Sequence, residues 1–156
     1  MSTRLTTNDV PMVESETLKL VIGAGQVNDS ISQYLSNTLK SNGYKFASPS
    51  ALNFLSALEC GVNYASEIAR NLGVSRQMVA KTVKELCLAG YLEQLSGVGK
   101  QKKIVFTITG ELLMSDARKL LAEIDHTLND KLGENSIAST VKNLNAIQEL
   151  ISQLTN

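Results

Sequence analysis

The chain has 156 residues, of which 43% are hydrophobic and 19% are charged, and its formal net charge at pH 7 is zero. This length and this apolar fraction suit one compact domain, and they exclude a low-complexity or largely disordered chain. A neutral total charge excludes attraction of the whole molecule to nucleic acid or to a membrane surface, so any electrostatic function must be local.

The cysteine count and the first residues of the chain predict its compartment. Cys60 and Cys87 are too few for a disulfide scaffold. The beginning of the sequence lacks the basic stretch and apolar run of a signal peptide, and no apolar stretch approaches the length of a membrane span. We therefore expect a protein of the reducing cytoplasm.

The first two segments are a tail and a long helix. Residues 1–15 are polar, of mixed charge and interrupted by Pro11, which indicates a flexible N-terminal tail or an arm that orders only against a partner. From about residue 16 to residue 41, apolar residues recur at steps of three and four, as in an amphipathic helix. Asn42 and Gly43 supply its end, because glycine takes the left-handed conformation at little cost. We interpret residues 16–45 as an N-terminal dimerisation helix.

Residues 46–109 carry three short helices and then a change of period. Ser48 and Pro49 predict a helix start, and this helix ends by Gly61. A second short helix covers about residues 64–72. Ser75 is placed to cap a third, which runs to about residue 89 and ends at Gly90.

After Gly90 the apolar pattern has a period of two. In "KKIVFTIT" Ile104, Phe106 and Ile108 point one way, as in a half-buried strand. The preceding "YLEQLS" is its expected antiparallel partner. Two glycines in "GVGKQ" suit the turn between the strands, so a β-hairpin is predicted.

Residues 110–156 predict two further long helices. Thr109 is placed to cap the first, which runs to Gly133, and Ser136 to cap the second. Both helices carry an apolar stripe, as does the helix at 16–41. The short central helices are too small to cover three such stripes. We therefore expect a homodimer in which the first and the last two helices interdigitate with their copies.

The central corner "NLGVSRQMVAKTVKEL" joins two helices through a short turn containing a glycine, as in a helix-turn-helix. If Val79 and Val83 turn inward, the opposite face of the second helix is basic and carries an amide. Residues 70–103 hold seven basic and two acidic side chains, a local charge of +5. Such a helix suits the major groove of DNA, where glutamine pairs with adenine and lysine donates to guanine.

The order and spacing of these elements resemble the winged-helix regulators of the multiple-antibiotic-resistance (MarR) family. The resemblance rests on "SPSALNFLSAL", "ASEIARNLGVSRQMVAKTVKELCLAGYLE" and "FTITGEL", and it covers nearly all of the chain after residue 15. It implies a mainly α fold with a small β-hairpin wing, namely a winged helix-turn-helix lobe (46–109) between long N- and C-terminal dimerisation helices (16–45 and 110–156). It also implies a dimer that binds double-stranded DNA at a pseudo-palindromic site, usually as a repressor modulated by a small ligand or by cysteine oxidation.

The resemblance also predicts the DNA-binding residues. By position, the groove-facing part of the recognition helix corresponds to Ser75, Arg76, Gln77, Met78 and Lys81. The wing departs from the family, because "SGVGKQKK" lacks the acidic residue and the paired arginines common there. This departure argues against minor-groove insertion by arginine. It leaves phosphate contacts to the wing lysines. With Lys84 of the recognition helix, the residues expected to neutralise phosphates are Lys84, Lys100, Lys102 and Lys103.

Other chemistry is poorly supported by the sequence. No catalytic constellation is present, and His126, the single histidine, has only scattered carboxylates near it, too few ligands for a transition metal. We expect no cofactor. A redox switch at Cys60 or Cys87 is the less favoured interpretation, because the family's peroxide sensors place their cysteine in the first helix, which has none here. The pair Gly23 and Gly25 is assigned to close helix packing.

Two alternatives and one ligand site stay open. The neutral total charge and the missing wing arginines allow a winged-helix module that binds a protein partner and never touches DNA. An enzyme or a metal-dependent sensor is a weaker third hypothesis. The resemblance implies an effector cleft, for which Tyr34, Phe46 and Phe54 are candidate lining residues, but no polar constellation identifies the ligand.

Overall fold

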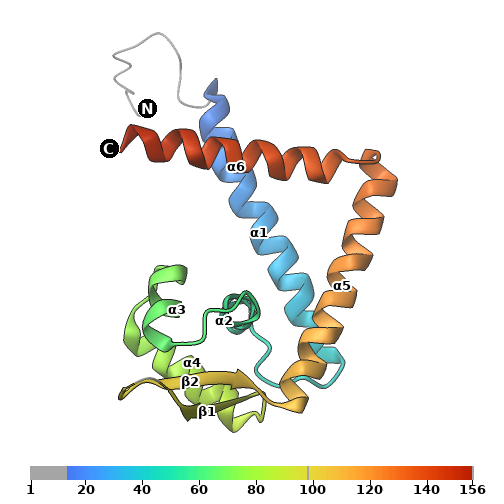
Figure 1. The fold of residues 1–156 in the computed structure, drawn as a ribbon. Helices are drawn as coiled ribbons and strands as arrows, with labels where there is room; N and C mark the ends of the chain where they lie inside the picture. The colour runs from blue at the N-terminus through green and yellow to red at the C-terminus, as the bar shows by residue number, and fades with distance from the viewer. Residues whose placement is uncertain (1–13, 98, 156) are drawn as a thin grey trace, which may run out of the picture. The chain divides into compact units, whose positions relative to one another are not determined.

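The computed structural model describes residues 14–97 and 99–155, so most of the predicted tail lies outside the described residues. The chain divides into two compact units, one ending at Glu111 and the other beginning at Leu112. Figure 1 shows the elements along the chain. They are α1 (Glu16–Ser41), α2 (Pro49–Glu59), α3 (Ala65–Leu72), α4 (Arg76–Leu88), β1 (Leu92–Ser96), β2 (Lys102–Phe106), α5 (Ile108–Leu132) and α6 (Ser136–Leu154).

Three helices of the first unit start where a serine caps them. The hydroxyl oxygens of Ser15, Ser48 and Ser75 accept hydrogen bonds from backbone N–H groups three residues later, at 3.1–3.3 Å. Pro49 occupies the first helical turn of α2, where its missing N–H removes no helical bond. The predicted starts at Ser48 and Ser75 are therefore confirmed.

The core of the first unit lies between the short helices and the hairpin. α2 packs against α1, α3 and α4, and α4 packs against β1. These elements bury their apolar sides together, so the lobe hides most of its own hydrophobic surface. The largest fully buried side chains of this unit are Phe54, Leu39, Leu55, Ile68, Leu86, Ile104, Val79 and Ser36.

The two strands form an antiparallel hairpin in which Gln94 lies opposite Ile104 and Leu95 lies opposite Lys103. The edge of β2 that does not face β1 is hydrogen-bonded to Asn63, in the loop before α3. The N–H of Ile104 donates to the carbonyl of Asn63 at 2.8 Å, and the amide of Asn63 donates back to the carbonyl of Ile104 at 3.3 Å. These two bonds hold the hairpin against the helical lobe.

The prediction of a strand through residue 109 was wrong at its end. β2 stops at Phe106, α5 begins at Ile108, and the Ile108 side chain is 83% exposed. The physical reason is Thr107, whose N–H and hydroxyl donate to the carbonyls of Tyr91 and Gly90. The same hydroxyl accepts from the N–H of Gly110, so Thr107 caps α5 in place of the predicted Thr109.

The predicted cap of the last helix was also wrong. Ser136 is the first residue of α6, and its hydroxyl donates to the carbonyl of Leu132 at the end of α5. Asn135 occupies the N-cap position in the left-handed conformation, with φ of 65°, and provides no side-chain hydrogen bond. The serine before this apolar run therefore donates its hydrogen bond to a carbonyl at the end of the preceding helix, where the last carbonyls have no partner within the helix.

Burial distinguishes the two ends of the chain from the lobe. No residue of α6 is buried, and six of its large apolar side chains are exposed. In α1 only Ser36 and Leu39 are buried, and Val21, Ile22 and Val27 are more than half exposed. Within the described residues, none of the helices has the length and hydropathy that a bilayer crossing requires.

Candidate nucleic-acid interface

α4 is the second helix of the helix-turn-helix, and its inner face is apolar as expected. Gly73 ends α3 in the left-handed conformation, with φ of 64°, which turns the chain toward the Ser75 cap of α4. Val79 is 1% exposed and Val83 is 5% exposed. The prediction that these two valines face the interior is therefore confirmed.

The outward side of α4 is a ridge that we define by Gln77, Lys81 and Lys84. All three side chains are exposed, and they lie opposite the buried valines by helical spacing. Glu85 has no predicted role, and its carboxylate lies 4.0 Å from the ammonium of Lys81. The Lys81 side chain is 77% exposed and the Glu85 side chain 46%, so the solvent-screened pair contributes little to stability, but it puts one negative charge beside the ridge.

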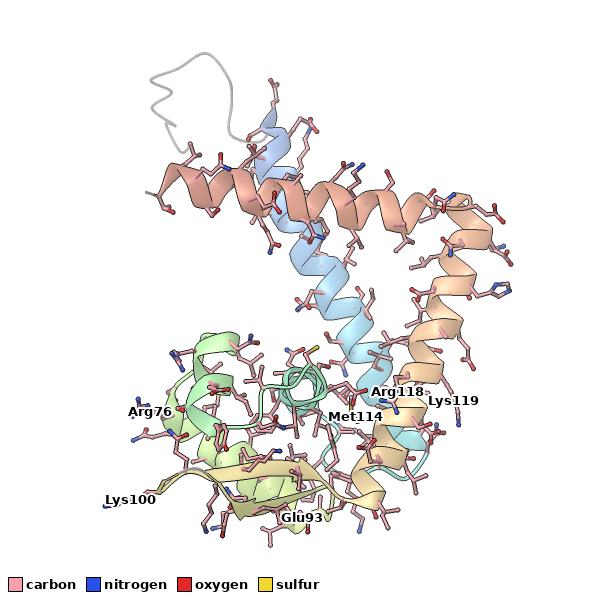
Figure 2. The ribbon with its side chains drawn as sticks, in the orientation of Figure 1. Arg76, Glu93, Lys100, Met114, Arg118 and Lys119 are labelled. Carbon is pink, nitrogen blue, oxygen red and sulfur yellow. The ribbon has the colours of Figure 1, made fainter. Side chains whose placement is uncertain are left out.

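Arg76 occupies a different position from the ridge, because it faces the hairpin. It lines a groove of about 360 Å³ together with Lys100 and Lys102 from the wing. Figure 2 shows Arg76 and Lys100 extending from the same side of the lobe, while Glu93 lies farther along the hairpin. The structure thus brings together one predicted residue of the recognition helix and two predicted residues of the wing.

A second groove continues along the same flank of α4. It has a volume of about 500 Å³ and is lined by Ala80, Lys84 and Cys87 of α4, among others. Ala65 and Gln94 border both grooves. Because Arg76, Ala80 and Lys84 are spaced by four residues, they follow the flank of the helix that faces the hairpin, and Lys84 is the ridge residue that borders this flank.

Met78 lies on the other flank of α4, away from the wing. It borders a small groove of about 110 Å³ whose other walls include Phe54 of α2 and Leu72 of α3. Thr82, one turn later, donates its hydroxyl to the carbonyl of Met78 at 3.0 Å. The predicted residues of α4 are therefore distributed over both flanks and the ridge, and Ser75 serves as the backbone cap.

The two neighbouring lysines of β2 point to opposite faces of the hairpin. Side chains alternate along a strand, so Lys102 shares the face of Ile104, which is fully buried against the lobe. Lys103 lies on the outer face, opposite Leu95. The wing lysines are equivalent as a sequence pattern, and only the strand register separates Lys102 from Lys103.

The thiols and the histidine have simple surroundings. Cys60 caps the end of α2 and is exposed, whereas Cys87 is partly buried in α4, and this burial raises the pKa of its thiol. A raised pKa lowers the thiolate fraction and so the reactivity of Cys87. His126 lies 3.7 Å from Asp130 on the surface of α5. Nowhere in residues 14–97 and 99–155 do three or more metal-ligating side chains cluster.

The three aromatic candidates for an effector cleft are not gathered in one groove. Phe54 is a core residue that borders the small groove beside Met78. Phe46 has a φ of 60° and lines a separate groove of about 640 Å³ with Tyr44 and Tyr91. Tyr34 is half exposed on α1. Burial raises the pKa of Tyr91, and a backbone hydrogen bond at Lys45 opposes this effect.

The wider fold matches solved structures of MarR-family transcriptional regulators. One from Methanosarcina mazei Go1 is 13% identical, with 90% of this chain and 94% of that chain covered and a TM-score of 0.74. A MarR/EmrR-family regulator from Acinetobacter sp. ADP1 is 19% identical, with 92% and 99% covered and a TM-score of 0.66. Wild-type MarR from E. coli is 15% identical, with 90% and 98% covered and a TM-score of 0.65.

The comparisons by sequence gave no match. No protein-family model matches the chain, and no curated protein matches it. At 13–19% identity, the three structural matches establish a shared fold that extends over most of the chain. The predicted winged helix-turn-helix with long helices at both ends of the chain is therefore confirmed as a fold.

Proposed function

We propose that the protein is a dimeric, sequence-specific regulator of the MarR type that binds double-stranded DNA, acting as a repressor modulated by a small ligand. One observation carries this proposal. The second helix of a helix-turn-helix buries its valines and exposes Gln77 and Lys81 on a ridge beside a groove of wing cations. An exposed helix of this kind has the size to enter the major groove of DNA.

The ridge residues have distinct roles in this proposal. Gln77 pairs with the N6 and N7 atoms of an adenine, and Lys81 donates to a guanine or to a neighbouring phosphate. Lys84 neutralises a phosphate at the edge of the groove. Glu85 forms an ion pair with Lys81 and repels phosphates. The repulsion disfavours positions of the helix that bring Glu85 near the DNA backbone, so it favours a single register on the duplex.

The exposed stripes on α1 and α6 support a homodimer. Six large apolar side chains of α6 are exposed in the single chain, and a helix of this composition is marginal in water without a packing partner. A two-fold dimer would place two recognition helices on one face of DNA. The half-site centres of its pseudo-palindromic site should then lie about 10 base pairs apart, one helical turn.

Footprinting of the DNA upstream of the protein's own gene tests the proposal. We expect two protected patches about one helical turn apart. A Gln77→Ala variant should retain binding but lose discrimination at one base pair of each half-site, by about 1–3 kcal/mol per bidentate pair. Gln33→Ala, an exposed glutamine on α1, is the control and should leave the footprint unchanged. Sequence-blind retention of DNA by the wild-type protein would contradict the proposal.

A protein-interaction module is the second candidate function. The neutral total charge, the absence of arginine from the wing and the carboxylate of Glu85 beside the ridge favour it. It predicts that DNA is held weakly, without sequence preference, and that Gln77→Ala has no effect on that binding. The footprint therefore separates the two functions directly.

A further inference from the structure

The groove between α4 and the hairpin, here called the wing groove, has an unusual charge. It is lined by Tyr64, Ala65, Ser66, Arg76, Gln94, Lys100, Gln101 and Lys102. Among these described residues the three charged side chains are all cations, and the other polar groups are neutral hydroxyls and amides. A concave site with like charges on both walls attracts an anion between them.

The walls of the wing groove come from three elements that are held in register. Arg76 is the first residue of α4, Tyr64 and Ser66 lie at the start of α3, and the lysines belong to the hairpin. The hydrogen bonds between Asn63 and Ile104 connect the α3 side to β2. A Cβ at Gly97 would lie 2.8 Å from a ring carbon of Tyr64, so this glycine lets the ring pack against the hairpin.

The wing groove also borders the N-terminal end of α3. Tyr64 is the N-cap residue but gives no side-chain hydrogen bond to the helix. The first backbone N–H groups of a helix carry partial positive charge, so this end reinforces the field of the three cations. Glu67 lies in the first turn of α3 but is not among the lining residues.

We infer that the wing groove holds a phosphate of the DNA backbone, so that the wing anchors on one strand and does not read the minor groove. This inference rests on the proposed function. A lysine ammonium is a compact point charge that suits phosphate, whereas minor-groove reading in narrow A·T tracts favours an inserted arginine. The arginine of this groove belongs to the recognition helix, and the wing supplies only lysines.

The geometry makes the two adjacent lysines of β2 unequal. Lys102 lines the wing groove and Lys103 lies on the outer face of the hairpin. Only Lys102 should therefore neutralise the bound phosphate, and the phosphate contact that the sequence predicts for Lys103 is no longer expected. The two residues form a matched pair, because both are exposed, both are on β2 and both lose the same charge on substitution by alanine.

The test compares wild type, Lys102→Ala and Lys103→Ala over a salt series, on a footprinted site and on random duplex. For Lys102→Ala we expect the slope of log affinity against log salt to flatten by about one per half-site, equally on both DNAs. For Lys103→Ala we expect the wild-type slope. Thermal unfolding of both variants checks that the fold is intact.

Two further measurements use the same proteins. Ethylation of phosphates flanking each half-site should interfere with wild-type binding, and Lys102→Ala should lose this interference. Exchanging A·T for G·C pairs in the flanking minor grooves should change wild-type affinity by less than about twofold, because the wing makes no base contacts there. A tenfold loss on that exchange, or equal slopes for the two lysine variants, would overturn the inference.

The outcomes also separate this inference from the proposed function. If the wild-type protein gives two spaced footprints but Lys102→Ala and Lys103→Ala have the same salt slope, the proposed function is supported and the phosphate site in the wing groove is rejected. If the wild-type protein gives no specific footprint, the proposed function fails first. In that case the phosphate site would still be supported if Lys102→Ala flattened the salt dependence of binding to random duplex and Lys103→Ala did not.

Discussion

The winged helix-turn-helix lobe and α6 differ in how far their apolar side chains are buried within the chain. Ile68, Val79 and Leu86 of the lobe are almost fully buried within the same chain, so the lobe has its own core. α6 has a comparable apolar stripe, yet none of its residues is buried. The difference indicates that the lobe is specified by contacts within its own unit, and the exposed stripe of α6 is the part of the chain that the proposed dimer would cover.

The largest expected effect comes from placing a charged side chain in the apolar stripe of α6. Leu144→Glu puts a carboxylate near the middle of the stripe, and in a two-fold interface both copies are buried together. We expect the dissociation constant of the dimer to rise at least about a hundredfold, because burying each unpaired charge costs several kcal/mol. Sedimentation over a concentration series measures this change.

The neighbouring residue provides the control for the α6 variant. Asn145→Glu adds the same charge one position later, about 100° around the helix from the stripe, and should leave the sedimentation profile unchanged. A wild-type protein that sediments as a monomer at all concentrations, or equal effects of both variants, would remove the dimer from the proposal.

A smaller effect is expected where the hairpin meets α5. The Cβ of an alanine at Gly110 would overlap the carbonyl oxygen of Tyr91 and lie 3.2 Å from a ring carbon of Phe106. Gly110→Ala should therefore reduce the free energy of unfolding by about 2–3 kcal/mol, despite the better helix propensity of alanine. Denaturant titration measures it. Thr109→Ala, an exposed neighbour, should change stability by less than about 0.5 kcal/mol.

The smallest predicted effect concerns a buried hydroxyl of α1. Ser36 is fully buried and its Oγ has no hydrogen-bond partner among the described residues. Ser36→Ala removes this desolvated group and improves helix propensity, so we expect the protein to become about 1 kcal/mol more stable. Ser32→Ala, one turn earlier and only half buried, should gain less, about 0.5 kcal/mol. A loss of stability in Ser36→Ala would show that the hydroxyl is satisfied in solution.

Local sequence signals predicted the first helices well, because their ends depend on neighbouring residues alone. Ser48 and Ser75 cap the helices that they precede, and Asn42 with Gly43 ends α1. The same kind of signal failed at Thr109 and Ser136. At both places a hydroxyl bonds to carbonyls of another segment or helix end, and a serine or threonine in the sequence does not reveal which backbone group it will reach.

The glycines show a similar limit. The pair Gly23 and Gly25 was attributed to close packing, yet the chain itself leaves open space within 4 Å of a Cβ at either position. At Gly97 and Gly110, by contrast, a Cβ would collide with Tyr64 and Tyr91 respectively. The local sequence does not predict these two close contacts. Helical periodicity alone placed Val79 and Val83 inside and Gln77 and Lys81 outside.

What the sequence determined by itself was therefore the set of elements, the apolar face of each and the local excess of positive charge, because these depend on spacing along the chain. Only the tertiary structure decided that Arg76 faces the wing, that Lys102 joins it in a groove and that Lys103 does not. The physical reason is that strand register and the packing of α3 against the hairpin are set by distant contacts. A change of one residue in register would exchange the two lysines between faces.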